Sequence, residues 1–290
     1  MSAGADGPGL SRLIARHLSA WPAPGALGAI VGGQATVGTV ATAGDAGRVF
    51  EWASVTKLLV GLSCLVAMEE GTLGLQDEAG PPGSTLGHLL AHASGLPFEG
   101  NVPVAPPGHR RIYSNRGIEV AAAHLAGRAG IPFEAYLHEA VLGPLQMAGT
   151  TLAGSPAHGA RGPLADLLAL AGELRSPTLV APETLSVATT VAWPGLSGVL
   201  PGFGRHDPCD WGLGPEVRGG KSPHWTGRAN SQRTYGHFGQ SGSFIWVDPD
   251  AGVALAGLST EAFGPWARQA WPAVSDAVLA CAGTAGAPGT

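Results

Sequence analysis

Ser54-Val55-Thr56-Lys57 places a hydroxyl and an amine three positions apart, directly before a long apolar run. Residues i and i+3 share one face of a helix, so the serine oxygen and the lysine nitrogen can come within hydrogen-bonding reach. A serine hydroxyl needs a neighbouring base to act as a nucleophile, and burial can lower the pKa of a lysine enough for it to serve. About one such spacing is expected by chance in a chain of this length. The alternative is an ordinary helix start, with Ser54 as the N-cap and Lys57 in solvent.

The elements expected around this pair are strands at both ends of the chain and helices between them. Glycine, valine and threonine in partial alternation predict a hairpin over residues 28–43 that turns near Gly32-Gly33, followed by a short strand over 49–52. Apolar residues at helical spacing predict helices over residues 10–21, 54–70, 85–92, 116–127, 132–141, 163–174 and 263–281. Short β-like segments lie at residues 236–238, 242–247 and 253–258.

This order of elements predicts an α+β fold. Residues 1–53 and 210–290 would form a discontinuous domain, in which one antiparallel sheet is covered by the first and last helices. Residues 54–209 would form an inserted, mostly helical lobe, and the active site would lie at the junction of the two.

The composition is that of a folded protein, with 44% hydrophobic and 13% charged residues among 290. A net charge of −5 without a basic cluster argues against nucleic acid as a partner. No apolar run reaches the roughly 18 residues that cross a membrane, and the first residues lack the layout of a secretory signal. We therefore expect a cytoplasmic protein without a membrane partner, whose oligomeric state the sequence does not indicate.

Neither a disulfide framework nor a metal site is expected. The three cysteines, Cys64, Cys209 and Cys281, are far apart and odd in number. His206, Asp207, Cys209 and Asp210 are close in sequence but lack the spacing of metal ligands. We expect no metal and no cofactor.

Two further motifs follow Ser54 and Lys57 along the chain. Tyr113-Ser114-Asn115 lies between a loop rich in proline and glycine and a predicted helix, and His237-Phe238-Gly239 lies on a predicted strand. The order Ser-x-x-Lys, Tyr-x-Asn and basic residue-x-Gly resembles the serine β-lactamase and penicillin-binding-protein superfamily, most closely its class C β-lactamases and family VIII esterases. Three further segments of this chain resemble segments of that branch. They are LLAHASGLP at residues 89–97, Pro107-Gly108, and GPLQM at residues 143–147 with Thr150.

The resemblance implies chemistry through an acyl-enzyme. Ser54 would be the nucleophile at a helix N-terminus, where the helix dipole favours negative charge, and Lys57 would help to remove its proton. Tyr113, held near the lysine ammonium, would exist partly as phenolate, act as general base and then protonate the leaving group. Asn115 would bond to Lys57 and to a substrate oxygen. Without the flanking motifs, Tyr113 is a half-buried aromatic residue and Asn115 a helix N-cap.

The strand motif would complete the site. The backbone N–H groups of Ser54 and Gln240 would form an oxyanion hole, with Gly239 and Ser241 at the substrate. His237 is a departure, because many β-lactamases and transpeptidases have lysine there, which attracts the substrate carboxylate. Histidine is less often charged at neutral pH, which favours a neutral ester, amide or thioester over a β-lactam. The alternative for His237 is a packed strand histidine.

We therefore predict a serine hydrolase that acts on a small ester or amide through an acyl-enzyme. Alternatives are an acyltransferase or thioesterase-like enzyme of secondary metabolism, a β-lactamase or D-amino-acid peptidase, and an inactive scaffold that binds a ligand. The substrate, the acyl acceptor and the role of residues 215–235 depend on loops whose shapes the sequence does not specify.

Overall fold

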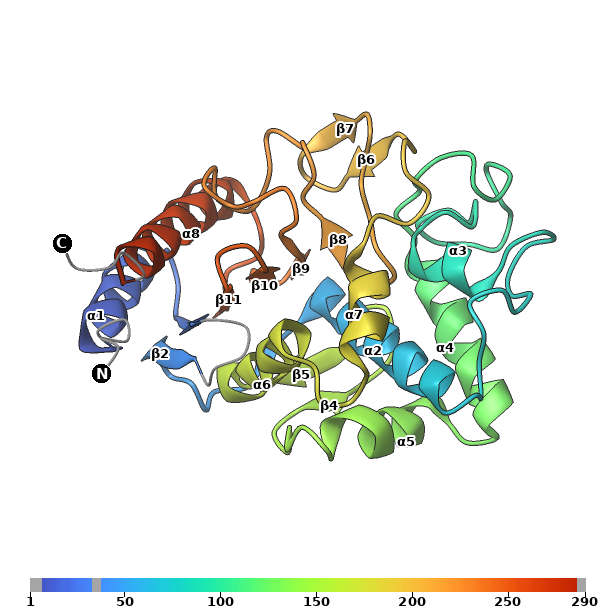
Figure 1. Ribbon diagram of the computed structural model, residues 1–290, viewed down its shortest axis with the longest axis horizontal. Helices are drawn as coiled ribbons and strands as arrows, with labels where there is room; N and C mark the ends of the chain where they lie inside the picture. The colour runs from blue at the N-terminus through green and yellow to red at the C-terminus, as the bar shows by residue number, and fades with distance from the viewer. Residues whose placement is uncertain (1–6, 33–37, 286–290) are drawn as a thin grey trace.

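The computed structural model describes residues 7–32 and 38–285 and contains a six-stranded antiparallel sheet (Figure 1). Its strand order is β2-β1-β11-β10-β9-β8. The strands are β1 (Gly25–Val31), β2 (Thr39–Gly44), β8 (Glu216–Val217), β9 (Tyr235–Gly239), β10 (Ser243–Asp248) and β11 (Val253–Ser259). The first strand of the chain pairs with the last, with Ala29 opposite Leu255. This mixture of helices and an antiparallel sheet confirms the predicted α+β class. The predicted turn near Gly32-Gly33 falls in part outside the described residues.

Both faces of the sheet are covered, because its central strands point apolar side chains in both directions. Phe244 and Trp246 of β10 belong to one core cluster, and Ile245 and Val247 belong to the other. Helices α1 (Gly7–Leu18) and α8 (Pro265–Ala285) lie side by side on the first face (Figure 1). Trp271 of α8 packs against Phe244 with ring centroids 4.8 Å apart.

Helix α6 (Leu164–Arg175) covers the second face, where it contacts β1, β10 and β11. Its residues fall within the range 54–209 that was expected to form a separate helical lobe. The part of the chain next to the sheet therefore includes a helix from the middle of the sequence, because α6 carries leucines that match the apolar second face.

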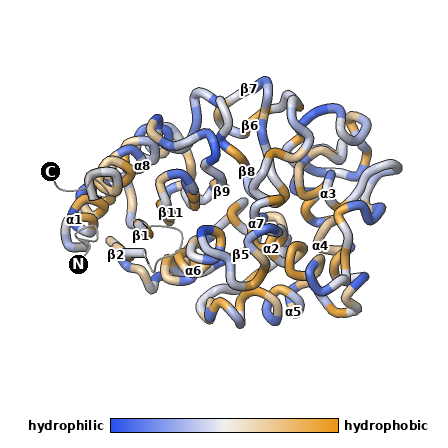
Figure 2. The backbone as a smooth tube through the Cα atoms, in the orientation of Figure 1, coloured by the Kyte–Doolittle hydropathy of each residue, from blue (hydrophilic) through white to orange (hydrophobic). Residues whose placement is uncertain are grey.

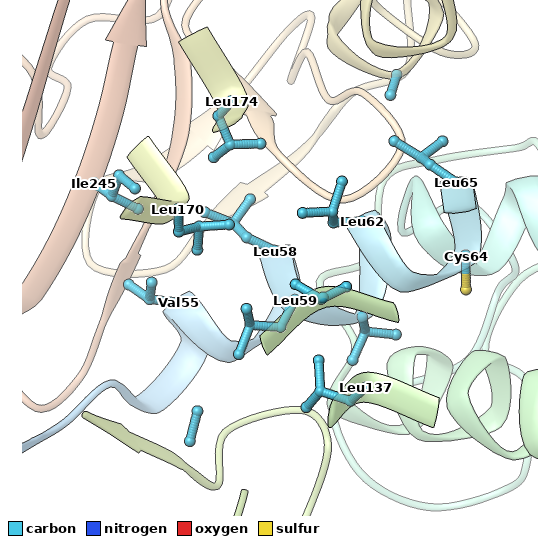
Figure 3. Packing of buried hydrophobic residues seen from close by; sticks show 14 of the residues in the cluster. Val55, Leu58, Leu59, Leu62, Cys64, Leu65, Leu137, Leu170, Leu174 and Ile245 are labelled. Carbon is cyan, nitrogen blue, oxygen red and sulfur yellow. The ribbon is translucent and has the colours of Figure 1, made fainter. Parts of the chain in front are cut away.

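Helix α2 (Thr56–Glu69) runs through the interior between the sheet and the remaining helices. Eleven of its 14 residues are buried, and Figure 2 shows mainly hydrophobic colour along it. Figure 3 shows its leucines gathered in one cluster with leucines of α6 and with Ile245 of β10. The surrounding helices are α3 (Leu86–Leu90), α4 (Asn115–Ala129), α5 (Phe133–Leu137), a π-helical turn (His138–Leu142) and α7 (Pro182–Thr189).

Two small sheets complete the fold. One has the order β3-β5-β4, with β3 (Phe50–Glu51), β4 (Thr151–Leu152) and β5 (Ala160–Gly162), and the other is the hairpin of β6 (Gly198–Leu200) and β7 (Gly204–His206). Among the helices of the described residues, none is both long and apolar enough to cross a membrane.

Candidate active site

Ser54 lies in the one-turn 3-10 helix η1 (Ala53–Val55), which leads directly into α2. Ala53, the preceding residue, has a φ of +44°, a region that alanine seldom adopts and that costs about 1–3 kcal/mol. Two hydroxyls hold this turn in place. Thr56 Oγ1 donates to the Ala53 carbonyl at 2.6 Å, and Ser243 Oγ of β10 donates to the Trp52 carbonyl at 2.7 Å. The candidate nucleophile is thus fixed by α2 and by the sheet.

The end of β9 approaches this turn so closely that only glycine fits at position 239. A Cβ on Gly239 would lie 2.4 Å from Ser243 Oγ and 2.5 Å from the Trp52 carbonyl oxygen. The next residue, Gln240, has an amide N–H for which the described residues provide no acceptor. Ser241 lies between β9 and β10. Its hydroxyl donates to the Glu51 carbonyl at 2.7 Å and so joins this connection to β3.

Lys57 lies one helical turn beyond Ser54, with a side chain that is completely buried. Its Nζ donates to Ser54 Oγ at 3.1 Å, to Asn115 Oδ1 at 2.7 Å and to the Ala157 carbonyl at 2.9 Å. Burial lowers the pKa of Lys57 from 10.5 to about 7, although the nearby Glu119 carboxylate opposes this change. Near neutral pH, the amine is therefore present in both its charged and its neutral form.

Asn115 is the first residue of α4, and the residue before it provides the helix cap. Ser114 Oγ accepts from the Gly117 N–H at 2.8 Å and donates to the Pro97 carbonyl at 2.6 Å. The backbone N–H of Ser114 donates to Nδ1 of the buried His92 at 3.2 Å. Ser114 is thus the N-cap, and Asn115 is free to direct its side chain to Lys57.

The Tyr113 ring packs among other aromatic side chains. Its ring centroid is 4.7 Å from that of His92, 5.7 Å from that of Trp211 and 5.8 Å from that of His237. Lys57 Nζ lies 4.8 Å from the centre of the Tyr113 ring. Burial raises the pKa of Tyr113 well above its ordinary value, although a hydrogen bond with Ser54 acts in the opposite direction. The phenol is therefore protonated at neutral pH.

His237 is buried on β9, and its Nδ1 lies 2.7 Å from the Phe238 carbonyl oxygen. A carbonyl only accepts, so Nδ1 carries the proton and Nε2 is an acceptor. Nε2 has no partner among the described residues. Burial and the charge of Lys57 lower the pKa of His237 to about 3, so the imidazole is neutral at physiological pH.

These side chains surround a cavity of about 150 Å³, which we call the catalytic cavity. Four residues of the predicted site line it, namely Ser54, Tyr113, His237 and Gln240. The rest of its wall was not predicted and is made of Phe98, Leu200, Pro201, Trp211, Glu216 and Phe238. The other predicted residues do not line the cavity. Lys57 and Asn115 are hydrogen-bonded to each other next to Ser54. Gly239 packs against η1, and Ser241 is hydrogen-bonded to β3.

Glu216 carries a buried negative charge at the wall of the catalytic cavity. Its Oε1 lies 3.1 Å from Lys221 Nζ and 2.9 Å from His224 Nε2, and Trp225 Nε1 donates to its Oε2. Burial alone would raise the pKa of Glu216, but Lys221, His224 and Trp225 hold it at about 2. In the described residues, no group of three or more His, Cys, Asp or Glu side chains could hold a metal ion.

Comparisons with known proteins identify one family. The Beta-lactamase family model matches residues 10–279. The crystal structure of a β-lactamase (Mb2281c) from Mycobacterium bovis is 53% identical, with a TM-score of 0.88, over 92% of this chain and 98% of that one. A search of curated proteins gives no significant match.

More distant solved structures share the fold. A mutant of the simvastatin synthase LovD from Aspergillus terreus is 16% identical, with a TM-score of 0.73, over 95% of each chain. EstCE1, described as a hydrolase with promiscuous acyltransferase activity, is 18% identical, with a TM-score of 0.73, over 94% of this chain and 97% of that one.

Proposed function

Because the chain belongs to the β-lactamase family and its buried Lys57 amine contacts the Ser54 hydroxyl, we propose that it is a serine hydrolase that forms an acyl-enzyme on small esters or amides. The contact between Lys57 and Ser54 is the observation that carries this proposal. A neutral amine has two N–H donors and one lone pair. With the donors on Asn115 Oδ1 and the Ala157 carbonyl, the lone pair faces Ser54 Oγ.

In the proposed acylation, neutral Lys57 removes the proton from Ser54 as its oxygen attacks the substrate carbonyl. The N–H groups of Ser54 and Gln240 stabilise the oxyanion that forms. Tyr113 donates its phenolic proton to the leaving oxygen or nitrogen, and the Lys57 ammonium returns a proton to Tyr113. Water then cleaves the acyl-enzyme by the reverse sequence of proton transfers.

This assignment gives the base role to Lys57 and the acid role to Tyr113, in place of the phenolate base that the family resemblance suggested. The physical reason is burial, which favours the neutral form of both groups. It lowers the pKa of Lys57 to about 7 and raises that of Tyr113.

The charges around the catalytic cavity favour a substrate that is uncharged next to the scissile bond. His237 is neutral, so it supplies no positive charge for a carboxylate. Glu216 adds a negative charge to the wall, although Lys221 compensates it. An ester or amide without a neighbouring carboxylate fits this environment better than a β-lactam does.

β-Lactam hydrolysis is the second candidate, favoured by the description of the Mycobacterium bovis protein as a β-lactamase. Nitrocefin tests it directly, because its ring opening is followed by colour. Turnover of nitrocefin as fast as that of an aryl ester would show that a neutral His237 suffices for β-lactams and would displace the first candidate.

Mass spectrometry of the intact protein tests the proposed function. We expect the wild-type protein to gain one acyl mass from p-nitrophenyl butanoate. We expect none from an N-acyl-D-alanine, an amide whose leaving group carries a free carboxylate. Ser54→Ala should gain no mass. Ser63→Ala is the matched control, because Ser63 is a buried serine of α2 whose hydroxyl has no partner among the described residues. It should be acylated like the wild type.

Acylation of Ser54→Ala at the wild-type rate would refute the assignment of the nucleophile. Failure of every ester to acylate the wild-type protein would instead support an inactive ligand-binding scaffold. Addition of an alcohol or amine as acyl acceptor distinguishes hydrolysis from acyl transfer, because transfer yields a new ester or amide in place of the free acid.

A further inference from the structure

A second cavity, of about 400 Å³, opens beside the catalytic cavity, and we call it the arginine groove. One wall is the loop of residues 97–113, and the other is formed by residues 197–205 around the β6–β7 hairpin. Phe98, Tyr113 and Pro201 line both cavities. The arginine groove therefore adjoins the catalytic cavity, and the Tyr113 side chain lies between residues of both.

The floor of the arginine groove is apolar and exposed. Phe98, Val104 and Val199 are 51%, 53% and 58% exposed. They are three of the seven large hydrophobic side chains that are exposed in the described part of the chain. Such a concentration of exposed apolar surface next to an active site is typical of a surface that a ligand covers.

Two positive charges border this apolar floor. Arg110 makes one hydrogen bond, to the Val104 carbonyl at 3.2 Å, and Arg205 makes one, to Ser197 Oγ at 3.2 Å. Neither forms an ion pair with any described residue, and no Asp or Glu of that set lines the groove. Their remaining N–H donors are available to an anion, for which the guanidinium fork is well suited.

Arg111 lines the same groove but has a different role. Its guanidinium is buried and donates to four backbone carbonyls, those of Ala91, Ala192, Trp193 and Cys209. These bonds join the loop before α4 to the end of α3 and to the segments before β6 and after β7. Arg111 is therefore a structural residue, and only the other two arginines can bind a ligand.

We propose that the arginine groove binds the leaving-group arm of the substrate, an apolar alcohol or thiol arm that ends in a carboxylate or a phosphate. This proposal rests on the proposed function, in which Tyr113 protonates the leaving atom. The bond to Ser54 Oγ forms first and gives the oxyanion, and the bond between the acyl carbon and the leaving atom breaks when the carbonyl re-forms and Tyr113 donates its proton to the leaving atom. Because Tyr113 lines both cavities, an arm attached to the atom that Tyr113 protonates extends over the apolar floor toward Arg110 and Arg205. The anion then lies away from the negative charge of Glu216, which lines the catalytic cavity and not the groove.

Three butanoate esters whose leaving arms each contain six carbons test the proposal. The alcohols are 6-hydroxyhexanamide, 6-hydroxyhexanoate and 6-hydroxyhexyl phosphate, and the kcat/KM of each ester is measured by chromatography of the released alcohol. We expect at least one anionic arm to exceed the amide by about tenfold at low salt, consistent with two exposed ion pairs. The comparison of the two anionic arms shows whether carboxylate or phosphate is preferred. About 0.5 M salt should reduce the preference, because it screens exposed charges.

Arg110→Ala and Arg205→Ala should each reduce the preference for the anionic arm by about threefold, and the double variant should nearly abolish it. Arg12→Ala is the matched control, because Arg12 is an exposed arginine of α1, far from the groove (Figure 1). It should retain the wild-type preference. Equal kcat/KM for all three arms in the wild type, or an undiminished preference in the double variant, would overturn the proposal.

Binding to Ser54→Ala separates this proposal from the proposed function. Isothermal titration should show that the better anionic alcohol binds this variant more tightly than 6-hydroxyhexanamide does, and that Arg110→Ala with Arg205→Ala removes the difference. If no ester acylates the wild-type protein, the proposed function fails, but this titration still decides whether the arginine groove binds an anion. Equal binding of the three alcohols would refute the arginine groove alone.

Discussion

The pH dependence of acylation tests the assignment of Lys57 as the base. Burial lowers the pKa of Lys57 from 10.5 to about 7. At pH 7, about half of the molecules then hold a neutral amine, compared with about one in 3,000 for a lysine of ordinary pKa. Burial therefore increases the fraction of the reactive form by about a thousandfold, which is the advantage of keeping this amine out of water.

We expect the rate of Ser54 acylation to rise about tenfold per pH unit below pH 7 and to level off above about pH 8. His237 should add no step between pH 5 and pH 8, because its pKa is about 3. The assay is the rate of labelling by a fluorophosphonate probe, followed by mass spectrometry from pH 5 to pH 9.

Glu119→Gln should move the midpoint of this profile to lower pH, because the negative charge of Glu119 raises the Lys57 pKa. Glutamine keeps an oxygen that can accept from Ser155 Oγ, as Glu119 does at 2.8 Å. Glu139→Gln, an exposed residue of the π-helical turn, is the control and should leave the midpoint unchanged. A midpoint above pH 9 in the wild type, or an upward shift in Glu119→Gln, would refute the reasoning.

The same lowered pKa makes the free energy of unfolding depend on pH. Between pH 7 and pH 10.5 the unfolded chain binds a proton at Lys57 that the folded protein does not hold, so stability rises with pH. The contribution of Lys57 has a slope of up to about 1.4 kcal/mol per pH unit. Urea unfolding at pH 7, 8 and 9 should show this extra slope in the wild type and not in Lys57→Met. If the free energy of unfolding changed with pH equally in the wild type and in Lys57→Met, a lowered Lys57 pKa would be contradicted.

Three further substitutions test the packing around the site by urea unfolding. Gly239→Ala should lower the free energy of unfolding by about 1–3 kcal/mol and slow acylation, whereas Gly127→Ala, in open space on α4, should be neutral or stabilising by up to about 1 kcal/mol; equal effects would contradict the close approach of β9 to η1. Ser114→Ala should cost about 1–2 kcal/mol, because it removes the α4 cap, and an unchanged midpoint would show that the cap is dispensable. Lys221→Met should cost about 3–5 kcal/mol by leaving the buried Glu216 carboxylate without the lysine charge that compensates it, and Lys221→Met with Glu216→Gln should recover part of that loss.

The residue pairs that are close in sequence were the most predictable parts of the site. The hydrogen bond between Ser54 and Lys57 follows from helical spacing alone. The predicted strands near β9, β10 and β11 follow from their β-branched and aromatic residues and the turn residues between them. The family motifs, rather than any spacing, indicated that Tyr113 and His237 would reach the same cavity.

Other parts of the site leave little signal in the sequence. The third acceptor for Lys57 is the Ala157 carbonyl, and every residue has a carbonyl, so its role depends only on where the chain passes. Glu216 and Trp211 line the catalytic cavity through long-range packing that no local pattern encodes. The β6–β7 hairpin has strands of three residues each, which is too short for alternation to be recognised.

The pairing of β1 with β11 affects how the protein folds during its synthesis on the ribosome. The first strand finds its central partner only after some 220 further residues have been synthesised, since Ala29 pairs with Leu255, and such long-range pairings slow folding. Ser54 emerges early, yet the Gly239 backbone against its turn and the Gln240 amide arrive near the end. A nascent or truncated chain therefore contains the serine and lysine without the strand that completes the catalytic cavity. We expect the proposed hydrolytic activity to appear abruptly, when the C-terminal strands join the sheet, and not to increase gradually during translation.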